Sequence, residues 1–110
     1  NLPPFAFHRL TDNLWSGRNP LTVRDVRTLA EAGVTHVLDL REEREWRGPD
    51  RYGADAVAAM APSGLVRRHV PVRDQSAPSR AAFDAAWAFA QEALGVPGTR
   101  LYVHCRAGRE

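Results

Sequence analysis

A single cysteine stands in a short cationic stretch, HCRAGRE, at positions 104–110. Cys105 follows the apolar run LYV and precedes Arg106, Gly108 and Arg109. A thiol has an ordinary pKa of about 8.5 and attacks only as the thiolate, which neighbouring guanidinium groups favour. A glycine-containing loop can also turn successive backbone N–H groups toward one bound anion. These residues predict a nucleophilic thiol beside a phosphate. The alternative from the residues alone is a buried structural cysteine at a strand end.

The elements around this stretch indicate an α/β layer fold with a mainly parallel sheet flanked by helices. β-branched and apolar runs predict strands, and apolar stripes between caps and glycines predict helices. The expected strands are 13–17, 34–40, 65–72 and 100–105, and the expected helices are 22–33, 54–61 and 80–94. Thr22 and Asp25 have the spacing of a capping box, Gly33 stands where a helix ends, and Ser79 caps the last helix.

In such sheets, ligands bind at the carboxyl ends of the parallel strands. Cys105 lies at the end of the last expected strand. Asp39 and Arg41 lie at the end of the strand at 34–40, where we expect a buried polar pair that ties loops together.

Two further expectations concern the packing of the elements. Arg67 and Arg68 indicate that the strand at 65–72 lies near an edge of the sheet. The last helix has an apolar stripe that places Trp87 in the core. The stripe consists of Phe83, Ala86, Trp87, Ala90 and Leu94.

Length and composition set the outer limits. The 110 residues suit one domain, 1–110, and the net charge of +2 argues against nucleic-acid or membrane binding through overall charge. No apolar run has the length of a membrane span. One cysteine allows no internal disulfide, and the four histidines lack a paired metal-ligand spacing, so no metal or other cofactor is expected. We expect a reducing, cytoplasmic location. The chain does not begin with Met, and we expect residues before Asn1.

The stretch HCRAGRE resembles the signature loop of the protein tyrosine phosphatase superfamily, histidine-cysteine-five residues-arginine, in its dual-specificity branch. The segments NLWSGRNP, AGVTHVLDLREERE and HVPVRDQSAPS are similar to those that precede this loop, so the resemblance covers nearly the whole chain. It implies a phosphatase-like α/β fold whose C-terminal helices are missing here. The signature arginine would stand directly after Glu110, and the 110-residue chain is therefore expected to lack a complete site and to be inactive.

The resemblance also implies roles for individual residues. Cys105 would attack phosphorus to form a phosphocysteine. Asp74, 31 residues earlier on a loop after a strand, would be the general acid. His104 would orient the loop by hydrogen bonds rather than transfer a proton. The substrate-binding loop would consist of Arg106, Ala107, Gly108, Arg109 and Glu110.

Two other functions stay open at this point. CRAGRE also resembles a rhodanese loop, which would make the chain a sulfurtransferase that carries sulfur as a persulfide. A catalytically dead phosphate-binding module is the other alternative. For the phosphatase, the expected partner is a phosphorylated substrate. Cationic residues at the positions of Arg106 and Arg109 occur in lipid-directed members, so lipid or inositol phosphates are among the expected substrates. Phosphoproteins are equally expected.

Overall fold

The computed structural model describes residues 7–41, 54–72 and 79–104. Within these ranges, five strands form one sheet in the order β1-β2-β5-β3-β4. The strands are β1 (Phe7–Arg9), β2 (Leu14–Gly17), β3 (His36–Asp39), β4 (Val66–His69) and β5 (Leu101–His104). The helices are α1 (Val23–Glu31), α3 (Ala54–Met60) and α4 (Arg80–Leu94). Every pairing among β2, β5, β3 and β4 is parallel, and β1 alone is antiparallel, to β2.

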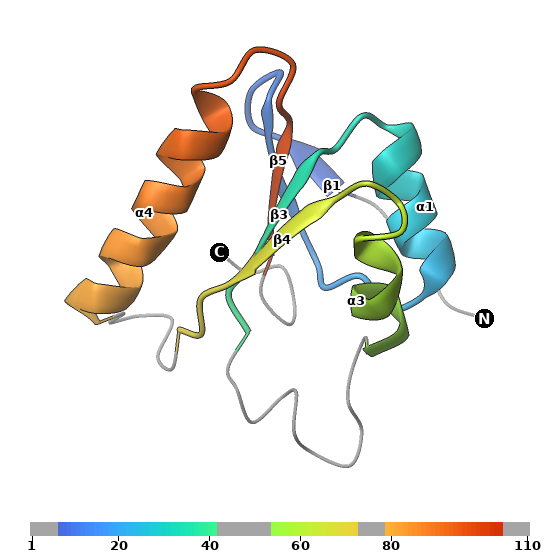
Figure 1. Ribbon diagram of the computed structural model, residues 1–110, viewed down its shortest axis with the longest axis horizontal. Coiled ribbons are helices and arrows are strands. Elements are labelled where there is room, and N and C mark those ends of the chain that lie inside the picture. Colours follow the sequence, from blue (N-terminus) through green and yellow to red (C-terminus); the bar gives the residue numbers. More distant parts are fainter. Residues whose placement is uncertain (1–6, 42–53, 73–78, 105–110) are drawn as a thin grey trace.

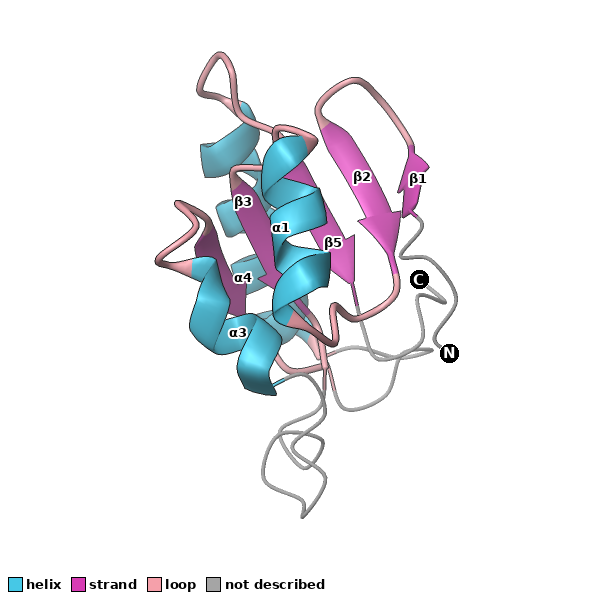
Figure 2. Cartoon of the chain, turned by 90° about the vertical axis from the view of Figure 1, so that its right-hand side faces the viewer, coloured by secondary structure: helices cyan, strands magenta, loops and turns pink. Residues whose placement is uncertain are grey.

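The sheet is the middle of three layers, as the sequence predicts. α1 and α3 cover one face and α4 covers the other (Figures 1 and 2). β5 lies between β2 and β3, so the last strand of the chain occupies the centre of the sheet. β1 is a three-residue strand that was not predicted from the sequence. It is held by pairing with β2 and by the stacking of Phe7 on Trp15, whose ring centroids are 4.8 Å apart.

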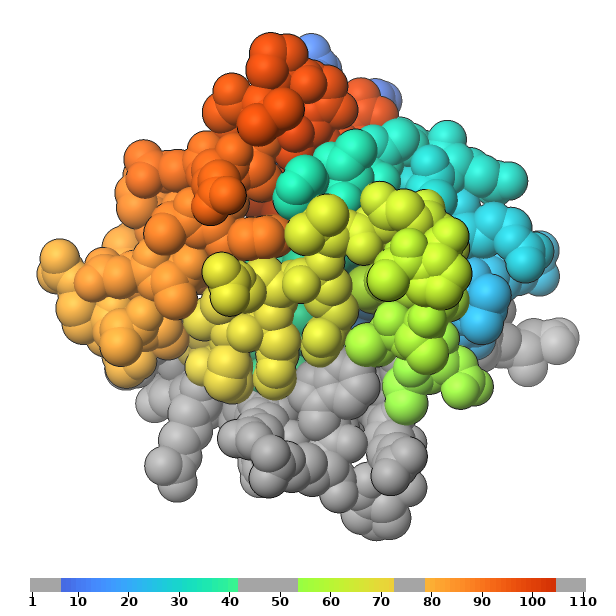
Figure 3. Space-filling view, viewed as in Figure 1, coloured from blue at the N-terminus to red at the C-terminus, as the bar shows by residue number. Residues whose placement is uncertain are grey.

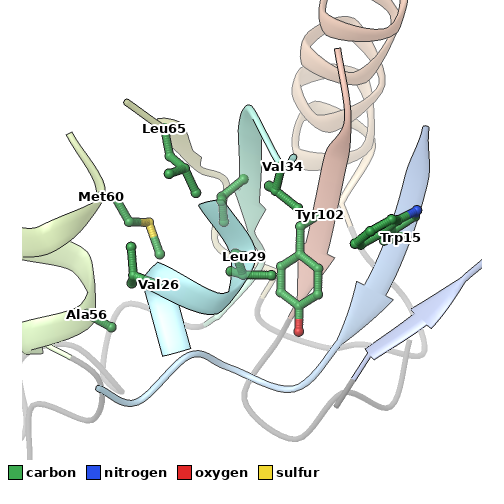
Figure 4. Packing of buried hydrophobic residues seen from close by; sticks show 9 residues of the cluster. Trp15, Val26, Leu29, Val34, Ala56, Met60, Leu65 and Tyr102 are labelled. Atoms are coloured by element: carbon green, nitrogen blue, oxygen red, sulfur yellow. The ribbon is translucent and has the colours of Figure 1, made fainter. Parts of the chain in front are cut away.

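The larger core lies between the sheet and the pair α1 and α3. Side chains from β2, β5, α1 and α3 meet there (Figure 4). Tyr102 is the largest fully buried side chain of the central strand β5. The buried members of this cluster are Trp15, Val26, Leu29, Val34, Val37, Ala56, Met60, Leu65 and Tyr102.

The smaller core lies between the sheet and α4, and it corrects one prediction. Trp87 is 55% exposed, as is Phe83, and the two rings stack on each other away from the sheet. Phe89 packs on the sheet side instead. α4 is so rich in alanine that several overlapping stripes are apolar, and its rotation against the sheet decides which stripe is buried. The helix residues that contact the buried Leu38, Val70 and Leu101 are Ala82, Ala86, Phe89, Ala90 and Leu94.

The helix ends follow the local signals in the sequence. Thr22 and Asp25 form the reciprocal capping box of α1, and the Ser79 hydroxyl accepts a hydrogen bond from the backbone N–H of Ala82 at the start of α4. Gly33 has a φ of 92°, a left-handed conformation that favours glycine directly after α1. β4 is an edge strand, as expected, and it reaches the surface between α3 and α4 in Figure 3.

Candidate active site

The parallel strands bring their carboxyl ends together at one edge of the sheet. Gly17 on β2 pairs with His104 on β5, His104 pairs with Asp39 on β3, and Asp39 pairs with His69 on β4. These four residues form a single row across the sheet, and the chain leaves each strand on the same side. We call this row and the residues that directly follow it the carboxyl edge.

His104 is the only residue of the proposed phosphatase site that lies within the described ranges. It is fully buried, and its carbonyl oxygen accepts a hydrogen bond of 2.8 Å from the backbone N–H of Leu40. This places the end of β5 at the centre of the carboxyl edge, and Cys105 is the next residue in the sequence. Cys105, the loop at 106–110 and Asp74 lie outside the described residues, so the roles expected of them stay predictions.

A buried ionic cluster lies at the same edge. Asp39 and Arg41 are both buried, and their side chains form a bidentate pair in which Arg41 Nη2 lies 2.8 Å and Nε lies 3.0–3.2 Å from the carboxylate oxygens. The predicted Asp39–Arg41 pair is therefore confirmed. The backbone N–H of Arg41 donates a further hydrogen bond of 3.0 Å to Asp39 Oδ1.

Arg67 is the third member of this cluster, and its contact with Asp39 was not predicted from the sequence. Its Nη2 donates to Asp39 Oδ2 over 2.8 Å, although Arg67 lies on the edge strand β4. Arg68, the next residue, belongs to the opposite face and lies over the ring of Phe89 on α4. The alternation of faces along a strand could have separated the two arginines, but only the register of β4 on β3 shows which one meets Asp39. We refer to Asp39, Arg41 and Arg67 as the Asp39 cluster.

The electrostatics of the Asp39 cluster favour an ionised carboxylate. Burial by itself would raise the pKa of Asp39. The hydrogen bonds from Arg41, together with the electrostatic interactions with His104 and Arg41, outweigh it and hold the pKa of Asp39 well below its usual range. Two guanidinium groups, those of Arg41 and Arg67, thus face the Asp39 carboxylate at the carboxyl edge.

Two histidines flank the Asp39 cluster. His69 Nε2 lies 2.8 Å from the carbonyl oxygen of Arg41, so this nitrogen carries the proton and donates it. His104 Nε2 lies 4.0 Å from Asp39 Oδ1, which is the range of an ion pair with a protonated imidazole. The imidazole next to Cys105 is thus within electrostatic reach of a carboxylate on the neighbouring strand.

The segment after β2 adds another arginine to the carboxyl edge. The carbonyl oxygen of Arg18 accepts a hydrogen bond of 2.7 Å from the buried Tyr102 hydroxyl, which ties this segment to β5. The Arg18 guanidinium lies 3.7 Å from Asp25 at the start of α1. Like the Asp39 cluster, this contact fixes a cationic group close to the end of a parallel strand.

Residues 7–41, 54–72 and 79–104 contain neither a group of metal ligands nor a membrane-spanning helix. No three histidine, cysteine or carboxylate side chains gather there as a metal site would require. No helix in these ranges combines the length and the apolar character needed to cross a bilayer.

Comparison with known proteins connects this arrangement to phosphatases. Residues 15–110 match the family model described as a polymorphic toxin system DSP-PTPase phosphatase. Dual specificity protein phosphatase 26 of Bos taurus is 33% identical over 101 residues, which cover 88% of this chain and 44% of the relative.

Solved structures show the same fold. PTPMT1 in complex with PI(5)P is 25% identical with a TM-score of 0.74, over 94% of this chain and 64% of that one. A kinase associated phosphatase, with its catalytic site cysteine substituted by serine, is 14% identical with a TM-score of 0.81, over 98% of this chain and 68% of that one. The chain thus spans less than half the length of the bovine relative and less than two thirds of PTPMT1.

Proposed function

The chain belongs to the DSP-PTPase phosphatase family, and on that premise we propose that the protein hydrolyses phosphate monoesters through a phosphocysteine formed on Cys105. The observation that carries the proposal is the position of His104, buried at the carboxyl end of the central parallel strand. The residue after such a strand is suited to present a nucleophile to a ligand, because ligands bind at this edge of α/β sheets. The sulfurtransferase alternative loses its support, because the residues that match the phosphatase family model include the stretch HCRAGRE.

The first step of the proposed reaction transfers the phosphoryl group to sulfur. The Cys105 thiolate attacks phosphorus, so that an S–P bond forms while the P–O bond to the leaving group breaks. Asp74, protonated, donates its proton to the departing oxygen, which leaves as an alcohol.

The second step releases phosphate. The Asp74 carboxylate accepts a proton from a water molecule as the water oxygen attacks phosphorus. The S–P bond then breaks, the thiolate is regenerated, and Asp74 is again protonated. The backbone N–H groups of residues 106–110 would hold the phosphoryl oxygens as negative charge builds on them.

The charge of the carboxyl edge supports this chemistry. The Asp39 cluster places the guanidinium groups of Arg41 and Arg67 at the carboxyl edge, and guanidinium groups favour both a thiolate and a phosphate. Arg106 and Arg109 add two positive charges to the loop sequence itself. We propose phosphoproteins and inositol phosphates, including inositol lipids, as the substrates. PTPMT1, a relative by structure, has been solved with PI(5)P.

The nucleophile is tested in the full-length protein with para-nitrophenyl phosphate. Cys105→Ser should abolish turnover while binding of tungstate, a phosphate analogue, persists. Retained turnover would show that Cys105 is not the nucleophile. A wild-type protein that binds tungstate without turning over any phosphoester would instead be a phosphate-binding module.

The general acid is tested with two aryl phosphates whose leaving groups differ in basicity. Asp74→Asn should lower kcat by roughly 10²-fold for the basic leaving group, which needs a proton, and by much less for the acidic one. Asp84→Asn is the matched control, because Asp84 is an exposed residue of α4 that pairs only with Arg80 among the described contacts. Equal losses for both leaving groups would make Asp74 a structural residue.

A further inference from the structure

The Asp39 cluster is more tightly constructed than a pair that merely joins two loops would require. Asp39 Oδ1 accepts hydrogen bonds from the backbone N–H and from Nε of Arg41, and Oδ2 accepts from Nη2 of both Arg41 and Arg67. Both carboxylate oxygens are therefore fixed, and the side chains of Asp39 and Arg41 have no exposed surface. The Asp39 carboxylate is therefore held in one position beside the end of β5.

The Asp39 carboxylate faces His104, the residue directly before the proposed nucleophile. Asp39 and His104 are paired residues of β3 and β5, and Asp39 Oδ1 is the oxygen that lies 4.0 Å from His104 Nε2. The backbone of His104 is bound to β3 as well, through the hydrogen bond from the N–H of Leu40 to its carbonyl oxygen. The main chain of His104 is thus held by β3, and its imidazole lies at ion-pair distance from a carboxylate of that strand.

We propose that Asp39 is a positioning residue for Cys105: clamped by Arg41 and Arg67, it orients the His104 imidazole and so sets the direction in which the chain enters the phosphate-binding loop. This inference rests on the proposed function, because it assigns Cys105 the role of nucleophile. Reacting groups must be held close to their productive geometry, and a misplacement of about 1 Å can cost roughly 10²-fold in rate. Among the described residues, the titratable and charged groups around Asp39 are Arg41, Arg67, His69 and His104.

The edge strand offers a matched pair of variants. Arg67→Gln removes one of the two clamping guanidinium groups, and Arg68→Gln removes the same charge from the neighbouring residue, which faces α4. Arg67 is partly exposed at the edge of the sheet, so its replacement should leave the fold intact. We expect Arg67→Gln to lower kcat about tenfold at an unchanged melting temperature, a loss smaller than that of a full displacement. Arg67→Lys should restore most of kcat, and Arg68→Gln should match the wild type. Equal kcat values for Arg67→Gln and Arg68→Gln would overturn the proposal.

Asp39→Asn distinguishes a positioning role from a purely electrostatic role of Asp39, because the two roles predict different changes in kcat and in the pKa of Cys105. By charge alone, removal of a carboxylate near the thiol lowers the pKa of Cys105. If Asp39 positions His104, the folded variant instead loses about tenfold or more in kcat, and its Cys105 pKa does not fall. A Cys105 pKa that falls while kcat is retained would reduce Asp39 to a counter-charge for the arginines and would overturn the proposal.

The thiol readout also distinguishes this inference from the proposed function. The rate of Cys105 alkylation by iodoacetamide is followed against pH by mass spectrometry of the peptide that contains it, in the full-length wild type and in each variant. This measurement needs no turnover. If the wild type hydrolyses no phosphoester, the proposed function fails. The positioning role also fails, beyond the two outcomes named above, if Arg67→Gln and Asp39→Asn both leave the alkylation profile and kcat as in the wild type.

Discussion

Asp25 stabilises the start of α1, and we expect its replacement to lower the free energy of unfolding. Its Oδ2 accepts hydrogen bonds from the backbone N–H of Leu21 at 2.9 Å and of Thr22 at 3.4 Å, and its own N–H donates to Thr22 Oγ1 at 3.1 Å. Asp25 is only 8% exposed, so the two amides that it accepts from would be left poorly solvated without it. Arg18 lies 3.7 Å away and adds a partly exposed ion pair.

Asp25→Ala removes both acceptor contacts together with the negative charge at the positive end of the helix. A net hydrogen bond to a charged group contributes about 1.5 kcal/mol at the lower end, and the longer contact to Thr22 contributes less. The helix dipole adds about 0.3–1 kcal/mol, and the screened pair with Arg18 adds at most about 0.5 kcal/mol. We therefore expect the free energy of unfolding to fall by about 2–3 kcal/mol. Asp25→Asn keeps an acceptor oxygen and should lose about 1 kcal/mol.

The assay is urea unfolding at neutral pH, with Glu31→Ala as the control. Glu31 is an exposed residue in the last turn of the same helix, where a negative charge gains nothing from the dipole. Its replacement should change the free energy of unfolding by less than about 0.5 kcal/mol. An Asp25→Ala variant no less stable than Glu31→Ala would refute the capping argument.

Three further predictions concern stability. Because the pKa of Asp39 is depressed in the folded state, its carboxylate stabilises the protein above the unfolded pKa of about 3.9, and this contribution is lost as pH falls below that value. In urea unfolding between pH 7 and pH 2, the free energy of unfolding of Asp39→Asn should therefore fall less steeply at acid pH than that of the wild type. Gly33→Ala should cost more than Gly98→Ala in melting temperature, since both glycines have positive φ values but only a Cβ at Gly33 would meet Arg100 Nη1, at 2.8 Å; equal losses would contradict this. Tyr102→Phe should cost about 1–2 kcal/mol in urea unfolding, because a carbonyl after β2 loses its 2.7 Å donor, and a neutral result would mean that water replaces the hydroxyl.

Much of the fold could be predicted from the sequence because its signals are local. The capping box of α1 joins residues three apart, and Gly33 ends that helix through its own backbone conformation. The run at 34–40 is apolar and β-branched on both faces, which is typical of a central parallel strand, and β3 does pair on both sides. Likewise, the apolar run before His104 predicts a strand, and His104 does end the central strand β5.

What the sequence could not determine depends on how distant elements meet. Arg67 is 28 residues from Asp39, and only the register of β4 on β3 brings its guanidinium to the carboxylate rather than into solvent. β1 has no apolar alternation of its own and exists through its pairing with β2. Trp87 is exposed because the alanine-rich α4 turns a different stripe to the sheet. Capping and strand propensity act between chain neighbours and can be predicted from the sequence, whereas register and helix rotation are set by the burial of surfaces that come together only in the folded protein.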